Sequence, residues 1–220
     1  MPNSVRVWDL PTRLFHWGLV ACVLGLSVTA YIPGSWIDWH ARLGLVVLAL
    51  LLFRIVWGFI GGRWSRFASF VYSPRSVLDY LRGKAHPDHL IGHNPLGAGS
   101  VFAMLAFLLA QVATGLFSDD EISFTGPLNR FVSSSKGLAA TWYHKQIGQW
   151  VLLALVVLHI AAILYYLFKK KDNLVRAMVR GDKPAPRGGM APSRDDTASR
   201  LLALAVFGVC AGLVYWIAML

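Results

Sequence analysis

The sequence predicts an all-α integral membrane protein, and three observations lead to this fold class. The chain of 220 residues is 56% hydrophobic and has a mean hydropathy of +0.53, which is too apolar for an ordinary soluble domain. Five windows contain the roughly 20 apolar residues that a helix needs to span a bilayer. Because lipid offers no partner to free backbone groups, these windows should be helices packed as a bundle.

The predicted helices fill most of the chain, at about residues 13–32, 40–60, 98–117, 143–168 and 200–220. The first window begins after Arg13 and is of full membrane length, so we expect it to serve as the insertion signal in place of a cleaved one. Asn94 and Pro95 open the third helix, because asparagine caps helices and proline suits the first turn.

The distribution of positive charge predicts the orientation. Lys and Arg gather before the first helix, between the second and third, and between the fourth and fifth. Loops rich in these residues stay in the cytoplasm, so we expect a cytoplasmic N-terminus and a periplasmic C-terminus. The net charge of +10 then follows topology and does not indicate nucleic-acid binding. The other side carries few basic residues, namely Arg42, Arg130, Lys136 and Lys145.

The segments between the helices predict three parts. Residues 1–183 form a four-helix membrane domain, in which 73–83 is a short interfacial helix. Residues 184–198 are rich in Pro, Gly and charge and should be a flexible cytoplasmic linker. Residues 199–220 form an additional transmembrane helix. The segment 118–141 faces outward and contains an acidic run.

The two cysteines, Cys22 and Cys210, lie in the middle of apolar helices, where packing is the expected role. Neither belongs to a C-x-x-C-H motif, which excludes covalent haem attachment of the c type.

Four of the seven histidines lie in or at the ends of predicted spans. The direction of each helix places His16 and His159 near the inner face, and His40 and His144 near the outer face. His144 and His159 are separated by about 22 Å along one helix and by about 60° around it. They therefore face the same sector of the bundle. The others, His86, His89 and His93, lie in a cytoplasmic loop, where we expect solvated side chains.

These depths predict two pairs, His16 with His159 and His40 with His144. Two opposed histidines with no convergent Cys or carboxylate suit the axial positions of a haem iron. A tetrahedral zinc site would need four ligands together.

Five further residues are candidates for contact with such a cofactor. Gly44 and Gly148 each follow an outer histidine by four residues, so they either clear space for a porphyrin edge, which we favour, or allow close helix packing. Arg54 lies inside the second span, where a haem propionate or a carboxylate could compensate it, unless it snorkels to the interface. Arg42 and Lys145 could hold propionates or lipid phosphate.

The sequence resembles the bacterial cytochrome b561 family, close to the cytochrome b subunits of nickel-iron hydrogenases. The resemblance rests on VWDLPTRLFHW, WHARLG, FRIVWG, GHNPLG and WYHKQIG, and it covers about residues 5–180. It implies a four-helix core with two non-covalent haem b groups in the bacterial inner membrane. By motif, the ligand roles fall on His16, His40, His144 and His159.

The leading functional prediction is respiratory electron transfer through two haems, between quinone or quinol and a periplasmic partner such as a c-type cytochrome or an oxidoreductase subunit. The segment 118–141 would dock that partner, and the inner interface near His16, Trp17 and Arg54 is the expected quinone region. One alternative is oxidation of a small outer-face reductant such as superoxide, with quinone as the acceptor. Another is a haem-free anchor or a proton-conducting bundle.

Overall fold

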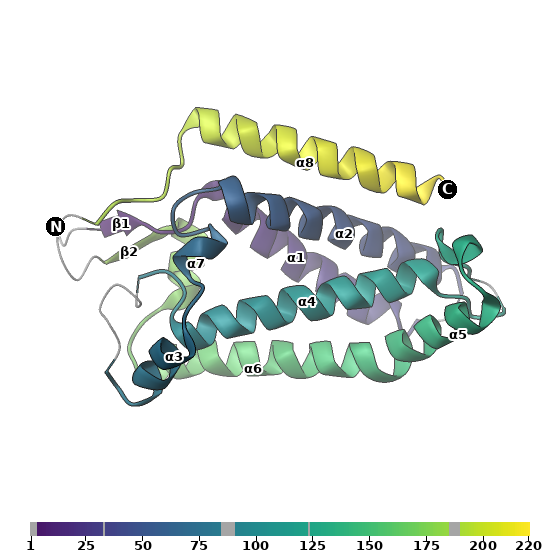
Figure 1. Cartoon of the computed structure of the whole chain (residues 1–220), viewed down its shortest axis with the longest axis horizontal. Helices are drawn as coiled ribbons and strands as arrows, with labels where there is room; N and C mark the ends of the chain where they lie inside the picture. Colours follow the sequence, from purple (N-terminus) through teal and green to yellow (C-terminus); the bar gives the residue numbers. More distant parts are fainter. Residues whose placement is uncertain (1–3, 33, 85–90, 123, 185–189) are drawn as a thin grey trace. The chain divides into compact units, whose positions relative to one another are not determined.

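The computed structural model describes residues 4–32, 34–84, 91–122, 124–184 and 190–220. Within these residues, five helical stretches are long and apolar enough to cross a membrane. The protein is therefore a multi-pass membrane protein, and the all-α fold class is confirmed (Figure 1). The five stretches are α1 (Leu10–Thr29), α2 (Trp36–Ile60), α4 (Pro95–Phe117), the continuous run Ser134–Phe168, and α8 (Thr197–Ala218).

The fourth stretch differs from the prediction in where it starts and in how it is wound. It consists of α5 (Ser134–Tyr143), a π-helix η4 (His144–Gly148) and α6 (Gln149–Phe168). Part of the segment expected to be an outward loop is therefore helical. The polar composition of α5 hid it, because the sequence windows sought apolar runs of membrane length.

The rest of the segment 118–141 is folded against the ends of its neighbouring helices. Thr141 accepts a hydrogen bond from the Asp119 amide at 2.9 Å and donates one to the Asp119 carbonyl at 2.8 Å. Asn129, in the 3-10 turn η3 (Asn129–Phe131), donates to the Phe117 carbonyl at 2.8 Å. An isolated bridge joins Asp119 and Thr125. These bonds give the segment a defined shape without long secondary structure.

The short elements have local causes. Ser73 caps the predicted interfacial helix α3 (Pro74–Leu81) by accepting from the Ser76 amide, and Asn94 caps α4 by accepting from the Gly97 amide. The helix α7 (Leu174–Arg180) ends at Gly181, whose φ of +91° suits glycine. A 3-10 turn η1 (Phe67–Ser69) follows α2.

A two-stranded antiparallel ribbon was not predicted. It pairs β1 (Ser4–Arg6) with β2 (Asp182–Pro184), outside the membrane-spanning helices. Strands of three residues leave no period that a sequence pattern could reveal, and their partners lie far apart in the chain.

The described chain divides into two compact units. Unit 1 comprises residues 1–15, 54–103 and 157–205, and unit 2 comprises residues 16–53, 104–156 and 206–220. A core of apolar side chains stabilises each unit. In unit 1 the core cluster is Val5, Val7, Trp8, Ile91 and Ala177. In unit 2 it includes Leu48, Ala49 and Val214, and the ring of Phe53 contacts that of Phe207.

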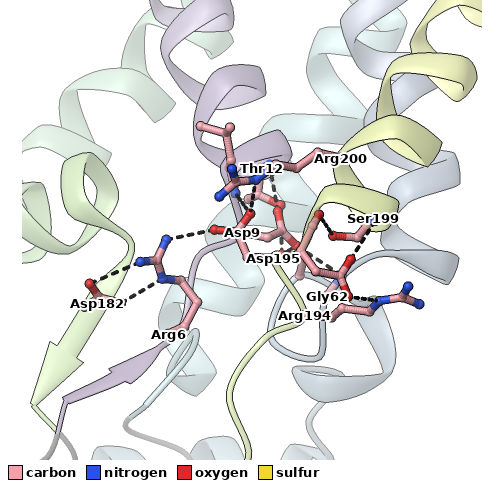
Figure 2. Close-up of polar contacts among 12 residues, drawn as sticks. Arg6, Asp9, Thr12, Gly62, Asp182, Arg194, Asp195, Ser199 and Arg200 are labelled. Atoms are coloured by element: carbon pink, nitrogen blue, oxygen red, sulfur yellow. Dashed lines mark hydrogen bonds and ion pairs between the residues drawn. The ribbon is translucent and has the colours of Figure 1, made fainter.

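A network of hydrogen bonds and ion pairs in unit 1 joins the N-terminal strand, the start of α1, β2 and the start of α8 (Figure 2). Arg6 lies between two carboxylates, with distances of 2.7 Å to Asp182 and 2.8 Å to Asp195. Asp195 also accepts from the Leu10 amide at 3.1 Å and from Arg200 at 3.0 Å. The start of α8 is thus bonded to the N-terminal strand and the start of α1.

The predicted linker, residues 184–198, is partly described. Residues 185–189 lie outside the described residues, whereas Ser193 donates to the Val7 carbonyl at 2.7 Å and accepts from the Trp64 amide at 3.2 Å. This part of the linker is held against unit 1. The division of the chain into three domains stays a prediction.

Candidate functional site

The two histidines predicted near the outer face lie close to one another in unit 2. His40 comes from the second turn of α2 and His144 from the start of the π-helix η4. Their ring centroids are 6.1 Å apart and their planes are inclined by 78°. Histidine nitrogens lie about 2 Å from a bound metal, so two rings on opposite sides of one iron have centroids about 6 Å apart. The geometry therefore fits a haem iron between these residues.

Hydrogen bonds at Nδ1 orient both rings. His40 Nδ1 lies 3.2 Å from the Leu26 carbonyl oxygen, and His144 Nδ1 lies 2.9 Å from that of Gln111. A carbonyl can only accept, so Nδ1 carries the hydrogen and Nε2 keeps the lone pair that a metal needs. Threonine hydroxyls, from Thr29 and Thr114, lie 3.3 Å from the same two nitrogens.

Gln111 contacts His144 in two ways, and sequence reasoning missed it. Its backbone carbonyl accepts from the ring, and its side-chain Nε2 donates to the His144 carbonyl at 3.0 Å. A π-helix shifts the usual hydrogen bonding of the helix by one residue, and such segments are frequent at functional sites. A lone glutamine in the apolar third span was the available signal.

The two glycines expected to act alike have different surroundings. A Cβ built at Gly44 has no heavy atom within 4 Å among the described residues, whereas one built at Gly148 overlaps Oε1 of Gln111. A third glycine, Gly115, lies against the ring of His144, because its Cβ would be 3.2 Å from His144 Cε1. Contact of Gly44 or Gly148 with a porphyrin stays a prediction.

The inner histidines belong to different units, and each is described by itself. His16 lies on α1 in unit 2, with its ring edge-on to Trp17 at a centroid distance of 5.1 Å. His159 lies on α6 in unit 1 and is partly buried. The pairing of His16 with His159 stays a prediction.

Arg54 is only 3% exposed, so its side chain is covered by protein. The guanidinium lies 4.8 Å from the centroid of the Phe67 ring, and its Nη1 has no hydrogen-bond partner among the described residues. The negative charge of the Asp9 carboxylate also interacts with the Arg54 guanidinium. A buried cation with an N–H to spare is suited to a carboxylate ligand, and a haem propionate is one. That role for Arg54 stays a prediction.

Asp9 is a fully buried carboxylate that sequence reasoning did not single out. It caps α1 by accepting from the Thr12 amide at 2.8 Å, and it accepts from the Gly62 amide at 3.0 Å and the Ser65 hydroxyl at 2.8 Å. The indole of Trp57 donates to it as well. Its place before Leu-Pro at a helix start was the signal for a capping role.

The remaining candidates lie at the surface. Arg42 and Lys145 are both exposed. The Cζ atom of Arg42 lies 5.2 Å from the centroid of the Trp39 ring. Between α3 and α4, the ring of His93 packs between the rings of Trp8 and Phe70, at centroid distances of 4.7 Å and 4.4 Å, so the expectation of a solvated His93 side chain is wrong. His86 and His89 lie outside the described residues. Within the described ranges, no group of three or more His, Cys, Asp or Glu side chains could hold a metal ion.

A helical membrane protein in which two histidine rings lie 6.1 Å apart has the side chains that a b-type cytochrome needs to bind haem. The family model of prokaryotic cytochrome b561 matches residues 7–181. The chain therefore belongs to the prokaryotic cytochrome b561 family, which confirms the resemblance seen in the sequence. Membership implies haem b and electron transfer across the membrane.

Curated relatives match along most of the chain. The Probable Ni/Fe-hydrogenase 1 B-type cytochrome subunit of Escherichia coli K12 is 26% identical, over 81% of this chain and 90% of the relative. Probable Ni/Fe-hydrogenase B-type cytochrome subunits of Bradyrhizobium diazoefficiens and Azotobacter vinelandii are 26% and 27% identical, over 82% and 81% of this chain and 86% and 88% of those proteins. No solved structure matches.

Proposed function

We propose that the protein carries electrons through two haem b groups between the quinone pool of the bacterial inner membrane and a periplasmic redox partner. The observation that supports this most directly is the opposed pair of His40 and His144, with centroids 6.1 Å apart and both Nδ1 atoms on backbone carbonyls. Such a pair holds Nε2 of each ring ready for one iron.

Ligation by two histidines favours electron transfer over ligand chemistry. Haem b would supply one-electron redox chemistry, and ligation by both His40 and His144 would favour electron transfer over the binding of a small ligand. The chain's contribution is to fix the two imidazoles and to surround them with apolar side chains. In this proposal His16 and His159 hold the second haem near the inner face.

The inner end of the membrane domain is the proposed quinone side. Reduction of a quinone takes two electrons and two protons, so two single-electron transfers would be needed for each quinone. Arg54 supports an anionic group at this level, because it is buried and has an unpartnered Nη1 among the described residues. We assign Arg54 to a haem propionate.

The outward segment is the proposed docking region. Its tip carries Ile122, which is 92% exposed beside acidic residues. The curated relatives are named as hydrogenase cytochrome subunits, which supports an oxidoreductase subunit of that kind as the partner, with a c-type cytochrome as the other candidate. On this topology the N-terminus is cytoplasmic and the C-terminus periplasmic.

The deciding experiment counts haem in the purified protein. We would record the reduced-minus-oxidised spectrum and the pyridine haemochrome, and repeat both for His40→Ala and His159→Ala. Two haems per chain, with a different one lost in each variant, is the expected result. A colourless protein of full helicity, or one haem lost equally in both variants, would defeat the proposal and favour the proton-conducting bundle.

Docking needs a gentler change than removal of the segment, because Asn129 and Thr141 bond it to the helix ends. Ile122→Ser changes only an exposed side chain, and Phe131→Ser, at an apolar side chain that is 61% exposed, is the control elsewhere in the segment. Slower reduction or oxidation by the partner in Ile122→Ser alone, with an unchanged haem spectrum, is expected. Rapid quinone reduction by superoxide without any protein partner would instead support the alternative function.

A further inference from the structure

Two threonines contact the outer histidines in the same local arrangement. Oγ1 of Thr29 on α1 lies 3.3 Å from Nδ1 of His40, and Oγ1 of Thr114 on α4 lies 3.3 Å from Nδ1 of His144. Each hydroxyl also donates within its own helix to the carbonyl four residues earlier, at 2.8 Å for Thr29 and 2.9 Å for Thr114. A hydroxyl has a single hydrogen, so its oxygen is left to accept from the imidazole N–H.

The carbonyl three residues before each threonine completes the arrangement. Nδ1 of His40 is 3.2 Å from the Leu26 carbonyl oxygen, and Nδ1 of His144 is 2.9 Å from the Gln111 carbonyl oxygen. Each imidazole N–H therefore faces two acceptors from one helical turn, a carbonyl and a hydroxyl. Two different helices provide the same pair of acceptors to the two rings.

We infer that Thr29 and Thr114 are positioning residues that hold His40 and His144 in the Nδ1–H tautomer and lower the reduction potential of the haem between them. This inference rests on the proposed function, because it concerns the outer haem. A hydrogen bond accepted from Nδ1–H makes the imidazole a more basic ligand. A more basic ligand stabilises the ferric state over the ferrous state, so loss of an acceptor raises the potential.

The simpler role for a helical threonine is to bond its own helix, and the chain contains matched controls for that role. Ser27 on α1 donates to the Val23 carbonyl at 2.9 Å, and Ser118 just after α4 donates to the Thr114 carbonyl at 2.7 Å. Both make the same bond to the fourth residue before them and, among the described contacts, neither has a hydrogen bond to an outer histidine.

The test is a redox titration of the purified, haem-containing protein, with the outer haem identified as the one lost in His40→Ala. Thr29→Val and Thr114→Val keep the side-chain shape and remove the hydroxyl, while Thr29→Ser and Thr114→Ser keep it. We expect each valine variant to shift the ferric–ferrous equilibrium of the outer haem by up to about tenfold, which is about 59 mV for one electron, toward higher potential. The inner haem, the serine variants, Ser27→Ala and Ser118→Ala should match the wild type.

Unchanged potentials in valine variants that keep both haems would overturn the inference. If a valine variant loses the outer haem, retention at the normal potential in the serine variant supports it, and loss in both overturns it. A wild-type protein without an outer haem would instead defeat the proposed function, a result obtained before any threonine is changed.

Discussion

The segments His40–Gly44 and His144–Gly148 share one spacing but differ in structure. The first is part of the regular α-helix α2, and the second is a π-helix that continues α5 into α6. A Cβ added at Gly44 would have no heavy atom of the described residues within 4 Å, whereas a Cβ added at Gly148 would meet the Gln111 side chain. The His144 carbonyl accepts from that side chain at 3.0 Å. The H-x-x-x-G pattern therefore fixes the residues but not their neighbours.

The difference indicates that the two histidines are held in place by different numbers of contacts. Both rings bond a carbonyl and a threonine hydroxyl through Nδ1. Only His144 has the additional backbone bond to a glutamine amide among the described contacts. The predictions below separate what the two segments share from what belongs to one of them.

The largest expected effect comes from removal of either ring. His40→Ala and His144→Ala should each abolish the same haem, because one iron needs both axial ligands for stable low-spin binding. The haem content would be measured by pyridine haemochrome, with the other haem as the internal reference. Retention of both haems in either variant would show that the two rings do not share an iron.

The next effect distinguishes the glycines. Gly148→Ala forces the Gln111 side chain to move, so we expect overpacking to lower the free energy of unfolding by about 1–3 kcal/mol. Gly44→Ala meets no protein atom within 4 Å among the described residues, and alanine in a helix interior is favoured over glycine by about 0.5–1 kcal/mol. Thermal unfolding in detergent would measure both.

Haem content sharpens the same comparison, and Gly99 offers a matched control because the space beside it is equally open. If a porphyrin edge lies beside Gly44, then Gly44→Ala should lower the haem content while Gly99→Ala leaves it unchanged. A Gly44→Ala protein with full haem content and higher thermal stability would contradict the predicted porphyrin contact at Gly44.

A smaller effect is expected for the Gln111 side chain. Gln111→Leu removes the amide bond to the His144 carbonyl but keeps the backbone carbonyl that orients the ring. The loss of one hydrogen bond should lower the free energy of unfolding by about 1 kcal/mol. The haem content and the potential of the outer haem should stay close to wild type. A potential shift as large as that of Thr114→Val would mean that the amide, and not only the hydroxyl, controls the ligand.

The smallest effect is expected for the polar network of unit 1. This network serves as a control outside the site. Burial raises the pKa of Asp195, but hydrogen bonds from Arg200 and the Leu10 amide, together with the charges of Arg200 and Arg6, hold this pKa below its ordinary value. A lowered carboxylate pKa stabilises the folded state above the unfolded pKa, and the stabilisation is lost as pH falls through the folded value.

Unfolding should therefore become easier below about pH 4. Asp195→Asn should remove this part of the pH dependence at a cost of about 1 kcal/mol or less, measured as thermal stability against pH. The haem spectrum should not change. An altered spectrum would show that this network and the outer site are coupled.

The spans and the family could be predicted because they depend on composition and on local patterns. Apolar runs of membrane length must form helices in lipid, and the caps at Ser73 and Asn94 need only neighbouring residues. The contacts that Gln111, Thr29 and Asp9 make outside their own helices could not be predicted, because those partners belong to other segments of the chain. Arg54 shows the limit clearly, since only the structure shows that this side chain is covered by protein, at 3% exposure.

The sequence by itself determined the number of spans, the membrane class and the four histidines that compose the candidate ligand set. Hydrophobic length and residue identity decide these features without reference to neighbours in space. Only the tertiary structure decided that the ring centroids of His40 and His144 lie 6.1 Å apart, that η4 is a π-helix, and that a carbonyl and a threonine hydroxyl orient each ring. The physical reason is that hydrogen bonds and packing act over a few ångströms between segments far apart in the chain.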